Sequence, residues 1–167
     1  MEENTFNQNI PTIEQPETAF AIVNSLPDSY LSDGYFATTE KGSKYLRPEY
    51  VADYAENIAV ALSSMKLTDY NGLLREMKRS KKSTLPFEAR QTAVAEMLPK
   101  ALNLVSHKKA PQILVDMIRA NLNAIKTDED WTAFYRHLDA ITGYLSAVVK
   151  STKKTKGKND DETEDIE

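Results

Sequence analysis

Residues 127–150, TDEDWTAFYRHLDAITGYLSAVVK, are the stretch that decides the fold of this chain. Large apolar side chains recur there in steps of three and four residues: Trp131, Phe134, Leu138, Ile141, Leu145 and Val148. On an α-helix that spacing makes one continuous apolar seam. Thr127 and the acidic residues that follow it resemble a capping box, which is typical of a helix start. The pattern predicts a helix of about 23 residues, whose seam other helices must cover.

Four further segments have apolar residues at helical spacing, namely residues 48–62, 67–83, 86–107 and 110–126. Pro48 suits the first position of a helix. Pro99 lies inside the third segment, where it should kink or split the helix. Between the turn signals Asp33-Gly34 and Lys41-Gly42, the aromatic pair Tyr35-Phe36 is interpreted as a clip against the domain. With no convincing strand, the predicted fold class is all-α, a compact bundle of about five helices with disordered charged tails.

The charges divide the chain into three parts. Residues 1–25 are predicted to be a flexible acidic N-terminal arm, residues 26–150 the helical domain, and residues 151–167 a disordered charged tail. Residues 1–40 hold seven acids and no Lys or Arg, whereas residues 41–150 hold 17 Lys and Arg against 12 Asp and Glu. The formal net charge of −4 therefore conceals a mildly basic central domain, which suits a polyanionic partner.

Composition argues against several classes of protein. The chain has no cysteine, which excludes disulfides and thiolate chemistry and fits a cytoplasmic location. Its uninterrupted apolar runs are far shorter than the ~20 residues that a membrane-spanning helix needs, and the acidic start does not resemble a secretory signal. Its five glycines are scattered singly, so no phosphate-binding loop is predicted. We expect no cofactor, no catalytic residue and no metal site.

The most distinctive stretch is REMKRSKKS at residues 75–83. On a helix, Arg75, Lys78, Arg79 and Lys82 are spaced i, i+3, i+4 and i+7 and share one face, opposite the apolar residues. Such a cationic ridge can bind phosphates through sequence-independent, salt-sensitive contacts. The alternative is a solvated surface helix with basic residues near its C-terminal end.

Other cations are candidates for the same role. The complete set of predicted RNA-binding residues is Arg75, Lys78, Arg79, Lys81, Lys82, Lys41, Lys44, Arg47, Lys108, Lys109 and Arg136. Away from the ridge, each cluster is equally consistent with an ordinary solvated loop. Tyr35, Tyr45 or Tyr135 could stack on bases, although each also suits the edge of the core.

The two histidines, His107 and His137, allow one catalytic hypothesis. Metal-independent ribonucleases often use a histidine pair as general acid and base. Nothing in the sequence places these two together, and the spacing of a His-based metal site is absent.

Three stretches, taken in order, resemble one family. They are residues 34–62 with GYF and LRPEYVADYAENIAVAL, residues 67–79 with LTDYNGLLREMKR, and residues 131–145 with WTAFYRHLDAITGYL. Together they resemble the small subunit of the type III-A CRISPR effector, the Csm complex. Members have Ser-Gln-hydrophobic-Arg soon after Leu-Thr, whereas this chain has Tyr70-Asn71-Gly72-Leu73 and its first arginine at Arg75.

The resemblance implies a helical subunit without an active site, in which stacked copies form a filament along a channel holding guide RNA and target RNA. It implies contacts with the large polymerase-like subunit and the backbone subunits, and basic residues on the RNA backbone. Cleavage would belong to neighbouring subunits. The alternative that the residues leave open is a helical adaptor that binds only protein, with the cationic ridge meeting an acidic partner.

Overall fold

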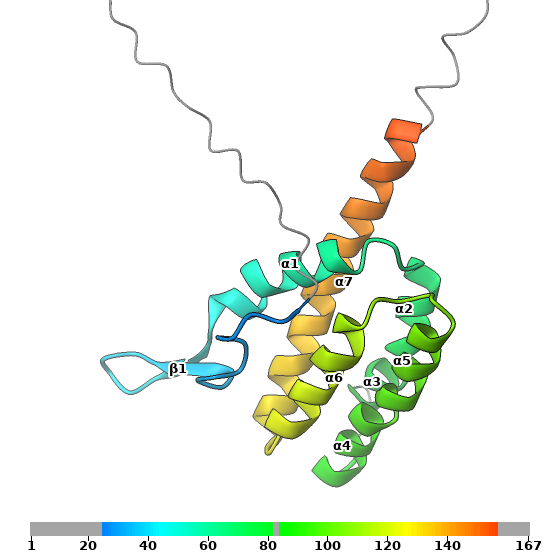
Figure 1. Ribbon diagram of the computed structural model, residues 1–167. Helices are drawn as coiled ribbons and strands as arrows, with labels where there is room; N and C mark the ends of the chain where they lie inside the picture. Colours follow the sequence, from blue (N-terminus) through cyan, green and yellow to red (C-terminus); the bar gives the residue numbers. More distant parts are fainter. Residues whose placement is uncertain (1–24, 82–83, 157–167) are drawn as a thin grey trace, which may run out of the picture.

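The predicted apolar seam lies on α7 (Asp128–Lys156), the longest helix in the computed structural model (Figure 1). The first five seam residues are at most 2% exposed, and Val148 is half-buried. The capping box is confirmed, because the Thr127 hydroxyl accepts a hydrogen bond from the Asp130 amide at 3.2 Å while the Asp130 carboxylate accepts one from the Thr127 amide at 3.0 Å. These reciprocal bonds satisfy amides that a helix start otherwise leaves unpaired.

The structure describes residues 25–81 and 84–156, with side chains as far as Val149. The predicted N-terminal arm, apart from Ser25, therefore lies outside the described residues, as do Lys82 and residues 157–167. The expected end of the last helix at Lys150 is wrong, because α7 continues to Lys156. The first six residues of the predicted disordered tail are helical.

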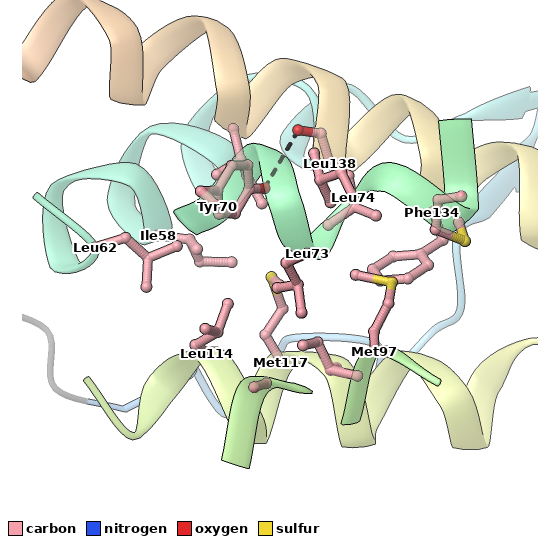
Figure 2. Packing of buried hydrophobic residues seen from close by; sticks show 14 of the residues in the cluster. Ile58, Leu62, Tyr70, Leu73, Leu74, Met97, Leu114, Met117, Phe134 and Leu138 are labelled. Carbon is pink, nitrogen blue, oxygen red and sulfur yellow. Dashed lines mark hydrogen bonds between the residues drawn. The ribbon is translucent and has the colours of Figure 1, made fainter. Parts of the chain in front are cut away.

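The remaining helices pack on α7 or on one another. They are the 3₁₀-helix η1 (Pro48–Tyr50), α1 (Asp53–Ala61), α2 (Leu67–Leu73), α3 (Arg75–Lys81), α4 (Phe87–Ala95), α5 (Met97–Ser106) and α6 (Ile113–Ala124). Helix α1 has the most extensive packing against α7, and α2 and α4 also contact α7. Figure 2 shows the resulting core, to which α7 contributes Phe134 and Leu138, and in which the Tyr70 hydroxyl donates to the Leu138 carbonyl at 3.4 Å.

Pro99 splits the third predicted segment, as expected. The break falls at Glu96, between α4 and α5, three residues before the proline itself. The ring of a proline clashes with the carbonyl four residues earlier, which here belongs to Ala95, the last residue of α4. Pro99 is then accommodated in the first turn of α5, where its missing N–H costs nothing.

The prediction of no strand is wrong. Strands β1 (Phe36–Thr38) and β2 (Lys44–Leu46) form an antiparallel hairpin with Phe36 opposite Leu46. The turn between them is closed by a bond from the Gly42 amide to the Thr39 carbonyl at 2.9 Å, and Gly42 has φ of 81°. The turn predicted at residues 41–42 is therefore confirmed, whereas the sequence pattern did not indicate the short strands on either side of it.

A buried polar and aromatic layer attaches the hairpin and the preceding segment to α6 and α7. This N-terminal aromatic layer consists of Tyr30, Tyr35, Tyr50, Asn121 and His137, none more than 8% exposed. The Tyr35 hydroxyl donates to Asn121 Oδ1 at 2.5 Å, and Asn121 Nδ2 donates to the Tyr30 hydroxyl at 2.7 Å. Burial away from water raises the pKa of the Tyr30 and Tyr35 hydroxyls well above their ordinary value.

The described chain is thus mostly helical, with one small two-stranded sheet at its side (Figure 1). The prediction of a mainly helical domain is therefore confirmed, whereas the absence of strands that an all-α fold implies is not. Within the described residues, none of the helices combines the length and the apolar character that crossing a membrane would require.

Candidate nucleic-acid interface

The cationic stretch forms α3, a two-turn helix that is buried on one side. Met77 and Ser80 face the core, while Arg75 and Arg79 are exposed on the opposite side and Lys78 is half-buried. The predicted ridge is therefore present as Arg75, Lys78 and Arg79, which we call the α3 ridge. It is shorter than predicted, because Lys82 lies outside the described residues.

The ridge residues have weak partners. Arg79 Nη1 lies 3.0 Å from Glu76 Oε2, and Lys78 Nζ donates to the Asn71 side chain at 3.1 Å. Arg75 has no hydrogen bond or ion pair within the described part of the chain. The Arg79 side chain is 72% exposed, and an ion pair that open to water contributes little. Most of the positive charge of the ridge is therefore available to a ligand.

Lys81 has a different environment from the α3 ridge. Its position in the helix is next to the buried side, and its Nζ lies 4.2 Å from the centre of the Tyr135 ring. Tyr135 in turn stacks on Trp131, with ring centres 5.6 Å apart and planes 20° from parallel. No pattern in the sequence indicates this contact, because Lys81 and Tyr135 are on helices far apart in the chain.

The cations near the hairpin are mostly occupied. Lys44 Nζ lies 2.6 Å from Glu129 Oε2 and 4.3 Å from the centre of the Phe36 ring, and Arg47 Nε donates to the Phe36 carbonyl at 3.3 Å. Lys41 is exposed at the hairpin turn. Arg136 lines a cavity of about 270 Å³ between the hairpin and the start of α7. These contacts attach the hairpin to the protein, so this cluster supports RNA binding less than α3 does.

Lys108 and Lys109 close the end of α5. The Lys109 amide donates to the Leu104 carbonyl at 2.8 Å and the Lys108 amide to the Val105 carbonyl at 2.9 Å, which together make a Schellman motif. Lys108 occupies the left-handed position of the motif with φ of 56°. Both lysines are exposed, so they can meet a ligand, but their backbone has a structural role.

The candidate cations do not form one surface. The hairpin projects from one side of α6 and α7, whereas α3 and the α5–α6 turn belong to the group of helices on the other side (Figure 1). The predicted RNA-binding residues therefore do not all lie on one side of the molecule (Figure 1).

The two histidines have opposite environments. His137 is fully buried, and its Nδ1–H donates to the Tyr50 carbonyl, while Nε2 has no partner within the described residues. Burial lowers the pKa of His137 to about 4. His107 is exposed at the end of α5, with Nδ1 2.8 Å from the Asn103 carbonyl. A general acid and base must both reach the substrate, so these environments do not support the histidine-pair hypothesis.

No metal centre is evident either. In residues 25–81 and 84–156, no three His, Cys, Asp or Glu side chains come together in a way that could hold a metal ion. Comparison of the chain with protein-family models, curated proteins and solved structures gave no match.

Proposed function

We propose that this protein is a non-catalytic small subunit of a type III-A CRISPR ribonucleoprotein effector that binds the backbone of guide or target RNA. The observation that carries the proposal is the α3 ridge, which lies on a short helix whose apolar side is buried, with Arg75 and Arg79 exposed and Lys78 half-buried. Phosphate contacts made by such a surface are independent of sequence. In this proposal, sequence specificity comes from guide pairing.

The ordered resemblance is the second support. The stretches that carry it include α1, α2, α3 and the first half of α7. Helices α1 and α2 both pack on α7, and the Tyr70 hydroxyl joins α2 to α7 at Leu138. The three stretches thus belong to one packed unit, as expected if a shared fold underlies the resemblance. The proposed partners are the large polymerase-like subunit, the backbone subunits and further copies of this chain, in a cytoplasmic complex for antiviral defence.

The decisive experiment purifies the tagged chain from its native host and identifies what accompanies it. We expect larger subunits and short RNAs of discrete length. A clean protein without RNA or larger partners would overturn the proposal. An acidic protein partner without RNA would favour the adaptor hypothesis instead.

A ridge variant tests which residues touch the RNA. Arg75→Ala, Lys78→Ala and Arg79→Ala together should leave α3 helical, because alanine has the highest helix propensity. RNA retention by the assembled complex should fall, and the slope of log affinity against log salt should decrease by about 2 for three lost contacts to a single strand.

The matched control removes three exposed cations elsewhere, with Lys66→Ala, Arg119→Ala and Lys126→Ala. The control should retain RNA better than the ridge variant. Equal retention by both would contradict a role for α3 and would direct attention to Lys108 and Lys109, or to the hairpin cations.

A further inference from the structure

Two cations and two aromatic rings form a continuous stack where α3 and α4 meet α7. Lys81 Nζ lies 4.2 Å from the centre of the Tyr135 ring, Tyr135 stacks on Trp131, and the Arg90 guanidinium lies 5.5 Å from the Trp131 ring centre. Trp131 is fixed from beneath, because its Nε1–H donates to the Arg90 carbonyl at 3.1 Å and only 2% of the residue is exposed.

The outer part of the stack remains accessible. Tyr135 is only partly buried, and Lys81 above it is exposed. The Tyr135 hydroxyl has no hydrogen-bond partner in the part of the chain that the structure describes. Tyr135 is thus a flat ring that stacks on the buried Trp131 ring, with the flexible Lys81 side chain over it. Rigid aromatic rings bind at a low cost in conformational entropy.

A nucleic-acid base should bind the Tyr135 ring more strongly than the Lys81 ammonium group does. A cation over an exposed ring contributes only about a 2- to 5-fold factor in an equilibrium constant. A nucleic-acid base on an aromatic side chain contributes about 5- to 150-fold. A base can therefore displace Lys81, whose ammonium group then becomes available for the phosphate beside it.

The position of Tyr135 suits a strand that follows α3. Lys78 and Lys81 are three residues apart and so lie on adjacent turns, on the side of α3 that leads from the ridge to α7. The nearby carboxylate is Asp139, whose charge contributes to raising the Tyr135 pKa after the larger effect of burial. Its negative charge disfavours phosphates along α7 and favours them on α3.

We propose that Tyr135 is a stacking platform for one unpaired base of a single-stranded RNA whose phosphates lie on α3. This inference rests on the proposed RNA-binding function, and it adds to the backbone contacts a base contact that is tolerant of sequence. In this proposal Lys81 lies over the Tyr135 ring when no RNA is bound, and it binds a phosphate when a base occupies the ring.

Trp131, the single tryptophan of the chain, lies directly beneath the platform and reports its occupancy. The experiment titrates the full chain with a short oligo(A) and with an abasic oligomer of the same length, and follows tryptophan fluorescence and anisotropy of the labelled oligomer. The variants are Tyr135→Phe, which keeps the ring, and Tyr135→Leu, which removes it.

We expect oligo(A) to quench Trp131 in the wild type and in Tyr135→Phe with similar affinity. Tyr135→Leu should lose about 5- to 150-fold in affinity for oligo(A) and nearly nothing for the abasic oligomer. The ridge variant should instead weaken both oligomers alike. Circular dichroism and thermal unfolding of each variant establish that it is folded.

Two outcomes would contradict the stacking role of Tyr135 while leaving the proposed RNA-binding function intact. One is an equal loss for both oligomers in Tyr135→Leu, and the other is saturated binding of oligo(A) with no change at Trp131. In either case the stack only joins α3 and α4 to α7. Failure of the wild type to bind either oligomer also overturns the platform, and RNA in the purified complex then decides the proposed function separately.

Discussion

Tyr135 and His137 are two residues apart on α7, yet they belong to regions of opposite character. His137 is fully buried in the N-terminal aromatic layer, where Asn121 and the tyrosine hydroxyls satisfy one another. Tyr135 is partly exposed between Trp131 and a single lysine. A helix turns about 200° over two residues, so one helix can hold the fold together with one side and present a binding surface with the other. Substitutions in the layer should therefore change stability, and substitutions around α3 should change binding.

The largest expected effect comes from removing the centre of the layer. Asn121→Leu leaves the Tyr30 and Tyr35 hydroxyls buried without their shared partner. Each orphaned hydroxyl costs about 1–3 kcal/mol, so the free energy of unfolding should fall by about 2–6 kcal/mol. Urea denaturation followed by circular dichroism measures the loss.

Tyr35→Phe provides the matched variant for this prediction. It removes the donor to Asn121 but keeps the ring, so the double variant with Asn121→Leu should lose less than the sum of the two single losses. Strict additivity would show that the two residues do not act through their hydrogen bond, and would contradict the role assigned to the layer.

The next effect is a dependence of stability on pH through His137. The folded protein keeps this residue neutral down to a pKa of about 4, whereas an unfolded chain binds the proton near 6.5. Protons therefore favour the unfolded state, so the contribution of His137 is complete above about pH 6.5 and is lost as the pH falls towards 4. The loss should amount to about 3 kcal/mol.

The measurement compares denaturation of the wild type with that of His137→Gln between pH 7 and pH 4. Glutamine keeps an N–H donor but does not titrate, so the variant should lose less stability over this range than the wild type does. His107→Gln serves as the control because His107 is exposed, and it should follow the wild type. Parallel curves for the wild type and His137→Gln would be incompatible with a buried neutral His137.

The smallest effect should be a gain in stability, at Lys108. A residue with a Cβ pays about 1 kcal/mol in the left-handed conformation that Lys108 adopts, and glycine avoids this cost. Lys108→Gly should therefore raise the free energy of unfolding by about 1 kcal/mol while it removes one candidate RNA-binding cation. Thermal unfolding measures the gain, and Lys109→Gly, without a positive φ, should not share it. A loss of stability in Lys108→Gly would contradict the inference that the backbone of Lys108 is strained in the left-handed conformation.

Most of the helices were predictable because their signals are local, but the single helix predicted over residues 67–83 divides into α2 and α3 at Leu74, which the spacing of apolar residues did not indicate. Apolar spacing identified the seam of α7, and Pro99 identified the break between α4 and α5. The position of the break at Glu96 follows from the reach of the proline ring, which the spacing of apolar residues does not reveal. The hairpin was missed because three-residue strands are too short to show alternation, so only the turn at Gly42 was visible.

The candidate site was predictable only in part. Helical spacing indicated that Arg75, Lys78 and Arg79 lie opposite Met77, and they do. It could not indicate that Lys81 covers Tyr135, or that Lys44 is held by Glu129, because these partners are remote in sequence. The different environments of His107 and His137 were equally invisible in the sequence.

By itself, then, the sequence determined most of the helices, their apolar sides and the cations Arg75, Lys78 and Arg79 of the ridge, because these depend on contacts within a few turns of the chain. Only the tertiary structure decided which polar groups are buried together, which cations remain free and which aromatic ring is left partly open. Those outcomes depend on the packing of α3, α6 and the N-terminal segment around α7. Packing brings together residues that no spacing along the chain relates.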